Sequence, residues 1–211
     1  NINLKKIINL EKKLNVMLKF KKIKGNLIHP TAIINWKSLI IGRGNTIGPY
    51  VIIGNQAQWK NKKNSGKIVI GNGNVFNEYT NIHLPTSIKK KTHIGNNNYI
   101  MNSTTIDHDC FLEDDVILSS NVILGGNIHI MKNANLGIKT IVHQNQVIGS
   151  FSMIGMGSII TKNKRILPGY MYYGKPVKKI RKNILGLKKN KINDKNLKSE
   201  HARFKKILKN I

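Results

Sequence analysis

Residues 105–128 read T-I-D-H-D-C-F-L-E-D-D-V-I-L-S-S-N-V-I-L-G-G-N-I and repeat one pattern every six residues. In each block of six, the second residue is a large apolar side chain and the sixth is mostly small or β-branched. Starting at Val69, the pattern continues without a break for 18 blocks, as far as Pro176. An amphipathic helix repeats about every 3.6 residues and a half-buried strand about every 2, so a period of six indicates neither.

The pattern predicts short strands joined by tight bends, in which each strand returns an apolar side chain to a shared axis. Gly and Asn follow the apolar position in many blocks, and they supply the bends because both tolerate positive φ. Three strands per turn give a triangular coil of 18 residues, and stacked coils pair as parallel strands about 4.8 Å apart. Because one coil cannot bury its apolar row alone, we expect an all-β solenoid of many coils.

The repeat also sets the domain boundaries. A weaker piece with similar spacing precedes it, so the solenoid is predicted over residues 27–176, with a loop over 55–68 where the phase breaks. Residues 1–26 carry apolar side chains at helical spacing opposite lysines, which predicts a basic amphipathic helical cap or, less favoured, a membrane-surface helix. Residues 177–211 are Lys-rich and predict a basic C-terminal helical region. The apolar positions of the weaker piece are Ile28, Ile34, Ile41, Ile47 and Ile53.

The chain is strongly basic, with 36 Lys and Arg against 9 Asp and Glu and a formal net charge of +27. Such a surface attracts anionic partners, although a compositional bias toward Lys, Asn and Ile would produce the same excess without selection for binding. Only 6% of the residues are aromatic, and neither a stacking platform nor a recognition helix is evident, which argues against specific nucleic-acid binding. We expect the charge to dock an acidic protein, with peripheral contact to an anionic membrane as the second choice.

Other bulk features limit the setting of the protein. No apolar run approaches the roughly 18 residues of a membrane span, and no secretory signal is visible. The single cysteine excludes an internal disulfide and suits a reducing compartment, so a cytoplasmic location is expected. The histidines show no spacing typical of a metal site, and no metal is expected; a metal shared by His108 and His143 is the disfavoured alternative. His83, His93 and His129 are interpreted as surface residues.

Counting by 18 places His108 at one corner of the solenoid. Residues 18 apart lie one coil above the other, so His108 should lie beside Gly126, and Gly126 beside Gln144. Gly126 would leave its backbone N–H accessible next to the imidazole, where an oxyanion could bind. Asp109 could orient the ring and favour its protonated form. The alternative is that His108 is an exposed loop histidine with no chemical role.

This corner offers a general base and an oxyanion donor but no good nucleophile. Ser119 and Ser120 fall on the next side of the prism, and Cys110 occupies an inward position. These placements favour direct attack by a substrate hydroxyl or amine on an activated acyl group, without an acyl-enzyme intermediate.

Three stretches resemble the acyl-carrier-protein-dependent UDP-N-acetylglucosamine O-acyltransferases of lipid A synthesis. They are residues 94–110, which end in I-D-H-D-C, the L-G-G of residues 124–126 and the I-V-H-Q of residues 141–144. The resemblance implies a left-handed parallel β-helix and a homotrimer with active sites in clefts between subunits. It also implies a UDP-sugar substrate, an acyl carrier protein as partner with its phosphopantetheine thioester as acyl donor, and no bound cofactor.

The resemblance assigns roles by position. His108 corresponds to the family's general base, Asp109 to its partner and Gly126 to the residue whose N–H holds the oxyanion. Met156 stands where the family controls the depth of the acyl groove, and its bulk predicts a shorter acyl chain. The substrate-contacting positions that the resemblance implies are Lys60, Asn127, His143, Gln144, Met156, Asn183 and Lys189.

Several positions depart from the family pattern. Thr105 and Asn127 stand where the family has histidines, Gln58 where it has an acid, and Leu185 where it has Glu. These departures concern acceptor recognition more than the base and the oxyanion donor. Acyl transfer to a UDP-amino sugar is therefore the predicted activity. The alternatives are a coenzyme-A-dependent sugar N- or O-acetyltransferase of the same fold and a non-catalytic β-helix scaffold.

Overall fold

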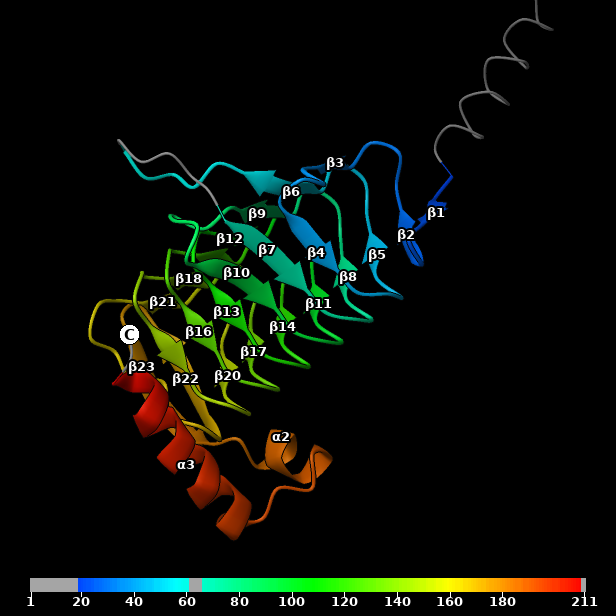
Figure 1. Ribbon diagram of the computed structural model, residues 1–211. Helices are drawn as coiled ribbons and strands as arrows, with labels where there is room; N and C mark the ends of the chain where they lie inside the picture. Colours follow the sequence, from blue (N-terminus) through cyan, green and yellow to red (C-terminus); the bar gives the residue numbers. More distant parts are fainter. Residues whose placement is uncertain (1–18, 61–65, 210–211) are drawn as a thin grey trace, which may run out of the picture.

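The computed structural model describes residues 19–60 and 66–209, which fold as a three-sided parallel β-helix (Figure 1). Short strands stack into three sheets, here called the first, second and third walls. Within the helix each strand pairs with the strands one coil before and one coil after it, and consecutive strands belong to consecutive walls. The all-β solenoid predicted from the hexads is confirmed.

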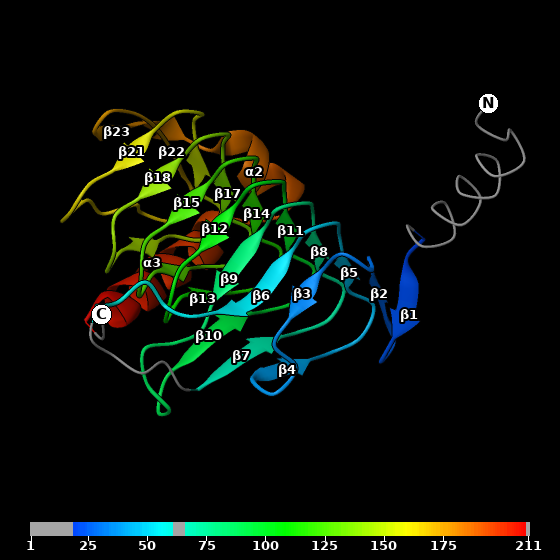
Figure 2. The ribbon, with the colours of Figure 1, turned by 90° about the horizontal axis from the view of Figure 1, so that it is seen from above.

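The first wall contains β1 (Lys21–Ile23), β2 (Asn26–Ile28), β5 (Thr46–Ile47), β8 (Val75–Phe76), β11 (Tyr99–Ile100), β14 (Ile117–Leu118), β17 (Asn135–Leu136), β20 (Met153–Ile154), β22 (Tyr170–Gly174) and β23 (Val177–Lys182). The second wall, seen as a row in Figure 2, contains β3 (Ile33–Ile34), β6 (Ile52–Asn55), β9 (Asn81–His83), β12 (Thr105–Ile106), β15 (Ile123–Leu124), β18 (Ile141–Val142) and β21 (Ile159–Ile160). The third wall contains β4 (Leu39–Ile41), β7 (Lys67–Ile70), β10 (Lys91–Ile94), β13 (Phe111–Leu112), β16 (His129–Ile130) and β19 (Val147–Ile148). The helices α2 (Ile184–Lys189) and α3 (Asp194–Leu208) follow β23.

The core is the stack of second-position side chains along the axis. In a typical two-residue strand such as β11, Tyr99 faces outward with 41% exposure, whereas Ile100 faces the axis and is fully buried. These inward residues form one continuous apolar cluster through the whole helix. At the fifth position the backbone takes positive φ, for example 61° at Asp109 and 58° at Asn127. This conformation explains why Asn, Asp and Gly are frequent at the corners.

From β10 onward, stacked positions are 18 residues apart, as the count predicts. Thr105 in β12 pairs with Ile123 in β15, and Ile123 pairs with Ile141 in β18. The turns that follow these three strands therefore lie one above the other. His108 and Gly126 belong to two of those turns and share one corner.

One block of the repeat is not a side of the prism. The strands β7, β8 and β9 pair with strands 24 residues later, as Asn81 does with Thr105. The prediction that every second position points inward is wrong at Ile88, which is 78% exposed. Residues 84–90 leave the helix as a loop between β9 and β10. A count by six cannot detect this loop, because it lengthens the coil by one whole block and leaves the phase unchanged.

The coils before Val69 follow the weaker repeat. Ile28 pairs with Ile47, and Ile34 pairs with Ile53, so the extra residue in this piece is absorbed without losing the inward row. The chain then leaves the walls between β6, which ends at Asn55, and β7, which begins at Lys67. This is the place of the loop predicted over 55–68.

The two ends differ in part from the expectation. Most of the helical cap predicted over residues 1–26 lies outside the described residues, and its described part forms a hairpin in which β1 pairs antiparallel with β2. Within the C-terminal region predicted as helical, residues 177–182 instead form β23, which pairs antiparallel with β22. Helices begin at Ile184, as the basic apolar pattern of this region predicts. None of the helices in the described residues is long and apolar enough to span a bilayer.

Ion pairs and an apolar cluster fix α3 against the third wall. Arg203 pairs with Glu113 and Glu200, and Lys132 Nζ lies 2.9 Å from Glu200 Oε1. Burial opposes the charge on Glu113, but hydrogen bonds from His129 and Arg203 outweigh it and lower the pKa of Glu113 to about 2. The helix therefore covers the C-terminal coils of this wall.

Candidate active site

The corner between the second and third walls gathers most of the polar residues singled out in the sequence. The turn of residues 107–110 joins β12 to β13, and the turns after β15 and β18 stack on it. Two loops reach the same corner: residues 84–90 contribute side chains to Asp109, and Trp59 from the chain after β6 lies against His108. The site is thus built from three stacked turns and two excursions of the chain.

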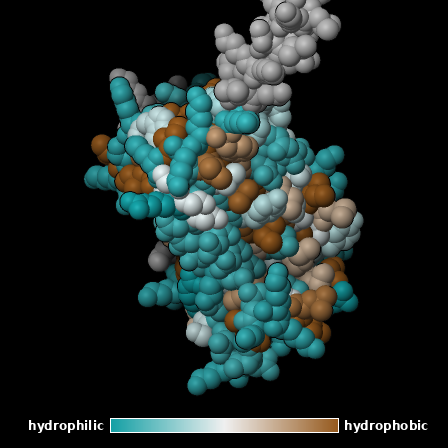
Figure 3. Space-filling model, turned by 90° about the vertical axis from the view of Figure 1, so that its right-hand side faces the viewer, coloured by the Kyte–Doolittle hydropathy of each residue, from teal (hydrophilic) through white to brown (hydrophobic). Residues whose placement is uncertain are grey.

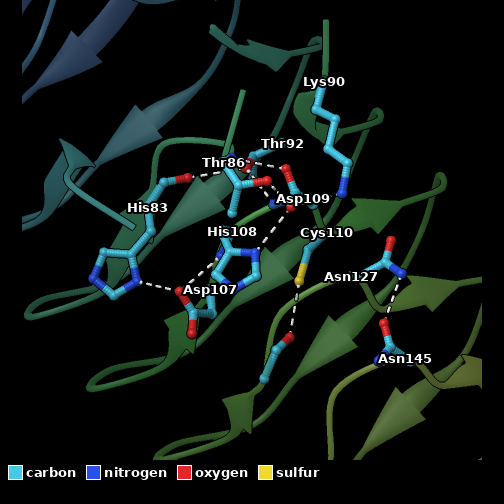
Figure 4. Close-up of polar contacts among 11 residues, drawn as sticks. His83, Thr86, Lys90, Thr92, Asp107, His108, Asp109, Cys110, Asn127 and Asn145 are labelled. Atoms are coloured by element: carbon cyan, nitrogen blue, oxygen red, sulfur yellow. Dashed lines mark hydrogen bonds and ion pairs between the residues drawn. The ribbon is translucent and has the colours of Figure 1, made fainter. Parts of the chain in front are cut away.

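His108 is a buried side chain with 5% exposure, so the alternative of an exposed loop histidine is wrong. Its Nδ1 lies 3.0 Å from Asp109 Oδ2 (Figure 4). If Nδ1 carries the ring proton and donates to the carboxylate, Nε2 has the lone pair that a general base needs. The Trp59 ring packs against the imidazole in a T-shaped arrangement with ring centroids 5.2 Å apart, which limits access of water to the ring.

Asp109 is held by a dense set of donors. Its Oδ1 accepts from the Thr86 backbone N–H at 3.0 Å, and its Oδ2 accepts from Thr86 Oγ1 at 2.7 Å and from Lys90 Nζ at 3.2 Å. Burial opposes the charge, but the hydrogen bonds from Thr86, His108 and Lys90 outweigh it, so the pKa of Asp109 lies below its usual value. The carboxylate is therefore ionised at neutral pH and fixes the orientation of the imidazole.

Gly126 lies directly against the His108 ring, as counting by 18 predicts. A Cβ at this position would overlap the ring atoms Cε1 and Nε2, so no other residue fits without displacing the imidazole. The Gly126 N–H has no hydrogen-bond partner among residues 19–60 and 66–209, whereas its carbonyl accepts from Asn145 N–H at 3.0 Å. An unpaired N–H next to a buried imidazole is the arrangement that can stabilise an oxyanion.

Four further residues of the predicted site lie on or near this corner. The Asn127 N–H donates to the His108 carbonyl at 2.8 Å, and its side chain donates to Asn145 Oδ1 at 2.7 Å. His143 and Gln144 are exposed in the next turn, where the His143 ring lies 3.0 Å from the Gln144 carbonyl through Nδ1. Lys60 is exposed beside Trp59.

Met156, Asn183 and Lys189 do not join His108 within one chain. Met156 is 67% exposed in the turn between β20 and β21, at the corner of the first and second walls. Asn183 and Lys189 line a groove of about 970 Å³ on the outer face of the first wall. The Asn183 amide caps α2 by accepting from Gly186 N–H and donates to the Phe151 carbonyl at 2.9 Å, so its side chain is already engaged.

The groove combines an apolar floor with a basic rim. Its floor is formed by outward side chains of consecutive first-wall strands, and α2 closes one side. Tyr99, Ile117 and Met153 contribute to the floor, and Arg181, Lys182 and Lys189 contribute to the rim.

Sequence reasoning missed part of this corner. His83 was expected at the surface, but it is 2% exposed and lies 2.9 Å from Asp107 Oδ1 through Nδ1. Thr86 and Lys90 could not be placed because the count assigned their segment to a wall. The sequence signal for this part of the corner was the D-H-D triplet, since it places a second carboxylate, Asp107, next to His108.

The described residues offer neither a cysteine nucleophile nor a cluster of metal ligands. Cys110 is fully buried and donates to the Gly125 carbonyl, and burial raises the pKa of its thiol to about 12. It is therefore no nucleophile. Across residues 19–60 and 66–209, no three His, Cys, Asp or Glu side chains gather in a way that could hold a metal ion.

Comparison with known proteins supports the resemblance. No family model matches the chain. It is 42% identical over 170 residues to a protein of Arabidopsis thaliana described as a probable acyl-[acyl-carrier-protein]--UDP-N-acetylglucosamine O-acyltransferase, mitochondrial. The resemblance drawn from the sequence is confirmed. The match covers 79% of this chain and 50% of that protein, so the chain spans half the length of the curated relative.

Solved structures agree over most of the chain. The Arabidopsis UDP-N-acetylglucosamine acyltransferase matches with a TM-score of 0.69 and 26% identity, covering 87% of this chain and 81% of that one. The UDP-N-acetylglucosamine acyltransferase of Bacteroides fragilis matches with a TM-score of 0.76 and 28% identity, covering 84% and 69%. The Moraxella catarrhalis O-acyltransferase matches with a TM-score of 0.65 and 28% identity, covering 83% and 82%. The left-handed parallel β-helix expected from the resemblance is thereby confirmed.

Proposed function

We propose that this chain is an acyltransferase that moves an acyl group from the thioester of acyl carrier protein to a hydroxyl or amine of a UDP-amino sugar. The observation that carries the proposal is the buried His108–Asp109 pair lying against the unpaired N–H of Gly126. The similar proteins suggest acyl carrier protein as the acyl donor and a UDP-amino sugar as the acceptor. The arrangement of His108, Asp109 and Gly126 suggests how the acyl group is transferred.

In this reaction His108 acts as the general base. Its Nε2 removes the proton from the acceptor as the acceptor oxygen or nitrogen attacks the thioester carbon. The charge that develops on the carbonyl oxygen is stabilised by Gly126 N–H. When the C–S bond breaks, the protonated imidazole gives its proton to the departing thiolate. Asp109 stabilises the imidazolium in between, because it is ionised and bonded to Nδ1.

The acceptor attacks directly in this scheme. Cys110 has no exposed surface and a raised thiol pKa. Ser119 and Ser120 belong to the corner between the first and second walls, whereas His108 lies between the second and third. No hydroxyl or thiol of the described turns is therefore placed to form an acyl-enzyme at His108.

A three-fold assembly would complete the site. The C-terminal coils of the third wall are covered by α3, whereas the first and second walls carry exposed apolar side chains such as Leu27 (48%), Ile33 (64%) and Ile123 (46%). Figure 3 shows hydrophobic side chains gathered beside a hydrophilic band on one side of the molecule. Packing the first wall of each copy on the second wall of the next puts the corner between these walls on a three-fold axis.

This arrangement joins two parts of the site that one chain keeps apart. The corner of His108 in one copy would then face the corner between the third and first walls in the next copy, where the groove lies. The neighbour's Lys189, Lys182 and Arg181 would supply positive charge for the diphosphate of the sugar nucleotide or for the acidic carrier protein.

A product assay tests the proposal. The chain is incubated with UDP-N-acetylglucosamine and either acyl carrier protein thioesters of graded acyl length or acetyl-coenzyme A, and the products are identified by mass spectrometry. An acylated sugar nucleotide formed from the carrier-protein donor supports the proposal, and a preference for short chains supports the role of Met156. Acetylation from coenzyme A alone would instead identify an acetyltransferase, and no product with either donor would favour a scaffold.

The shared site has its own test. Size-exclusion chromatography with light scattering should give three times the chain mass of 23.8 kDa. Two inactive variants, His108→Ala and Lys189→Ala, should regain activity when unfolded and refolded together, because mixed trimers contain clefts with both native residues. Failure of the mixture, with each variant alone still trimeric, would place both residues in one subunit's site or outside the chemistry.

A further inference from the structure

The buried His83 and the partly buried Asp107 form a second pair beside His108 that the chemistry above does not use. His83 is 2% exposed, and its Nδ1 lies 2.9 Å from Asp107 Oδ1. The same oxygen accepts the backbone N–H of His108 at 2.8 Å. Figure 4 shows Asp107 between the two histidines. Asp107 is therefore fixed both to the main chain of the proposed base and to a buried imidazole.

Two contacts fix the orientation of the His83 ring. Its Nε2 lies 3.0 Å from Asn81 Nδ2, and an amide NH₂ group can only donate. Nε2 must then accept, which leaves the ring proton on Nδ1 to be donated to Asp107. His83 thereby holds the Asp107 carboxylate in place.

Asp107 keeps one oxygen open. Burial opposes its charge, but hydrogen bonds from His83 and from the His108 N–H outweigh it, so the pKa of Asp107 is lowered. Its side chain is 20% exposed, and within residues 19–60 and 66–209 its Oδ2 has no hydrogen-bond partner. In the next coil the corresponding position is Gly125, because Thr105 pairs with Ile123. No side chain of that turn covers the open oxygen.

Asp107 differs from Asp109 in its charged partners. Asp109 pairs with Lys90, whereas Asp107 has no Lys or Arg partner in the described part of the chain. The chain has only 9 acidic residues against 36 basic ones, so an open carboxylate beside the base is not a general feature of this surface. A partly buried, ionised carboxylate with a free oxygen binds hydrogen-bond donors, and it binds cationic donors most strongly.

We propose that Asp107, held by His83, binds the amino group of the acceptor and makes this site prefer an amine over a hydroxyl as acyl acceptor. The inference rests on the proposed acyl transfer and names the acceptor class at the same corner. A sugar amine is protonated in part near neutral pH, since amines next to electron-withdrawing groups titrate at about pH 8. Asp107 would attract this ammonium form and hold it beside His108.

The transfer to an amine balances as follows. The ammonium on Asp107 releases one proton to solvent, and the free amine attacks the thioester carbon, so that a C–N bond forms while the oxyanion is held by Gly126 N–H. His108 takes a second proton from the nitrogen. The C–S bond then breaks, and His108 passes this proton to the thiolate. The products are an amide and a thiol, with one proton left in solvent.

A competition assay in one tube tests the preference. Wild-type enzyme receives equal amounts of UDP-N-acetylglucosamine and an analogue in which one sugar hydroxyl is replaced by an amine, together with acyl carrier protein thioester. Mass spectrometry then gives the ratio of amide to ester. We expect at least a tenfold preference for the amine, and a fall of that ratio by about 10- to 100-fold in Asp107→Asn, which is the scale of one charge-assisted hydrogen bond. Because both products form in one tube, the ratio does not depend on how much enzyme is folded.

Two further variants separate binding from structure. His83→Asn keeps the charge on Asp107 but loosens it, so the ratio should fall less than in Asp107→Asn. Glu78→Gln removes a carboxylate at another corner and should leave the ratio unchanged. A wild-type preference for the hydroxyl, or an equal loss of both products in Asp107→Asn, would overturn the inference while leaving acyl transfer intact. Acylation of neither sugar would overturn the proposed function itself.

Discussion

Two corners of the same prism carry columns of buried polar side chains, and they differ in whether those columns are closed. At the corner between the third and first walls, the asparagines 26, 45, 74 and 98 stack in successive coils and are at most 1% exposed. Asn45 donates to Asn26 Oδ1 at 2.9 Å, and Asn74 donates to Asn45 Oδ1 at 2.9 Å. Each of these amides also binds backbone groups of its neighbours. Most of the polar capacity of this ladder is used within the protein. The exception is Asn98 Nδ2 at the end of the ladder, which is buried without a hydrogen-bond partner among the described residues.

The corner of His108 is also polar and largely buried, but its unpaired groups lie where a ligand can reach them. Gly126 N–H and Asp107 Oδ2 have no hydrogen-bond partner in the part of the chain that the structure describes. Gly126 lies against the His108 ring, and the Asp107 side chain is 20% exposed, whereas the unpaired Asn98 Nδ2 of the ladder is buried away from any such base. The comparison teaches that an unpaired polar group alone does not mark a site, and that its position beside a reactive side chain does.

The largest difference between the corners should appear in the rate of acyl transfer. His108→Ala removes the base, and we expect the rate of acyl transfer to fall about 10²- to 10⁴-fold while the thermal midpoint stays close to that of the wild type. Initial rates with saturating donor and acceptor measure the effect. A variant with the wild-type rate would show that this corner is no more catalytic than the asparagine ladder.

The second difference concerns the glycine beside the imidazole. Gly126→Ala places a methyl group where the His108 ring lies, so the ring must move away from the oxyanion donor. We expect a loss of about 10²-fold in kcat, similar to the removal of one oxyanion donor, with a smaller change in KM for the acceptor. A loss confined to KM would mean that the glycine only makes room for the substrate.

Counting along the repeat predicted one of the two corners. The period of six predicted the solenoid, and the spacing of 18 placed His108, Gly126 and Gln144 on one corner, because every coil from β10 onward has the same length. The buried ladder was not predicted. Its members are separated by 19, 29 and 24 residues, since the early coils contain an extra residue and two loops.

The other residues of the His108 corner could not be predicted from the repeat, for a related reason. Thr86 and Lys90 lie on a loop that lengthens its coil by one block of six, so the repeat keeps the same phase on both sides of the loop. His83 is 25 residues from His108 in sequence, which matches no multiple of the coil. Trp59 reaches the imidazole from an excursion of the chain. Periodicity therefore finds residues that belong to the walls and misses residues on the loops that converge on them.

The third difference is one of stability. Asn74→Ala leaves the Gly95 carbonyl and the Asn98 N–H without their present partners inside the core, and it leaves Asn45 Oδ1 with only the backbone N–H of residue 74. We expect the free energy of unfolding to fall by about 2–4 kcal/mol, measured by guanidinium denaturation, with kcat unchanged below the unfolding transition. The opposite result, an intact stability with a lowered rate, would contradict the structural role of the ladder.

The smallest difference is the response of the two corners to acid, and it follows from the kind of polar group that each contains. The folded pKa of Asp109 lies below its ordinary value of 3.8, because hydrogen bonds from Thr86, His108 and Lys90 outweigh burial. Its ionised form therefore stabilises the fold above about pH 3.8, and this contribution is lost as the pH falls through the folded pKa. In Asp109→Asn the contribution is absent at every pH. The difference in unfolding free energy between wild type and this variant should be constant from pH 7 to about pH 5 and should shrink below the ordinary pKa. The ladder contains only amides, so the deficit of Asn74→Ala should stay the same over the whole range. If the difference in unfolding free energy between wild type and Asp109→Asn did not change with pH, the fold would not lower the pKa of Asp109. Another group would then have to orient His108.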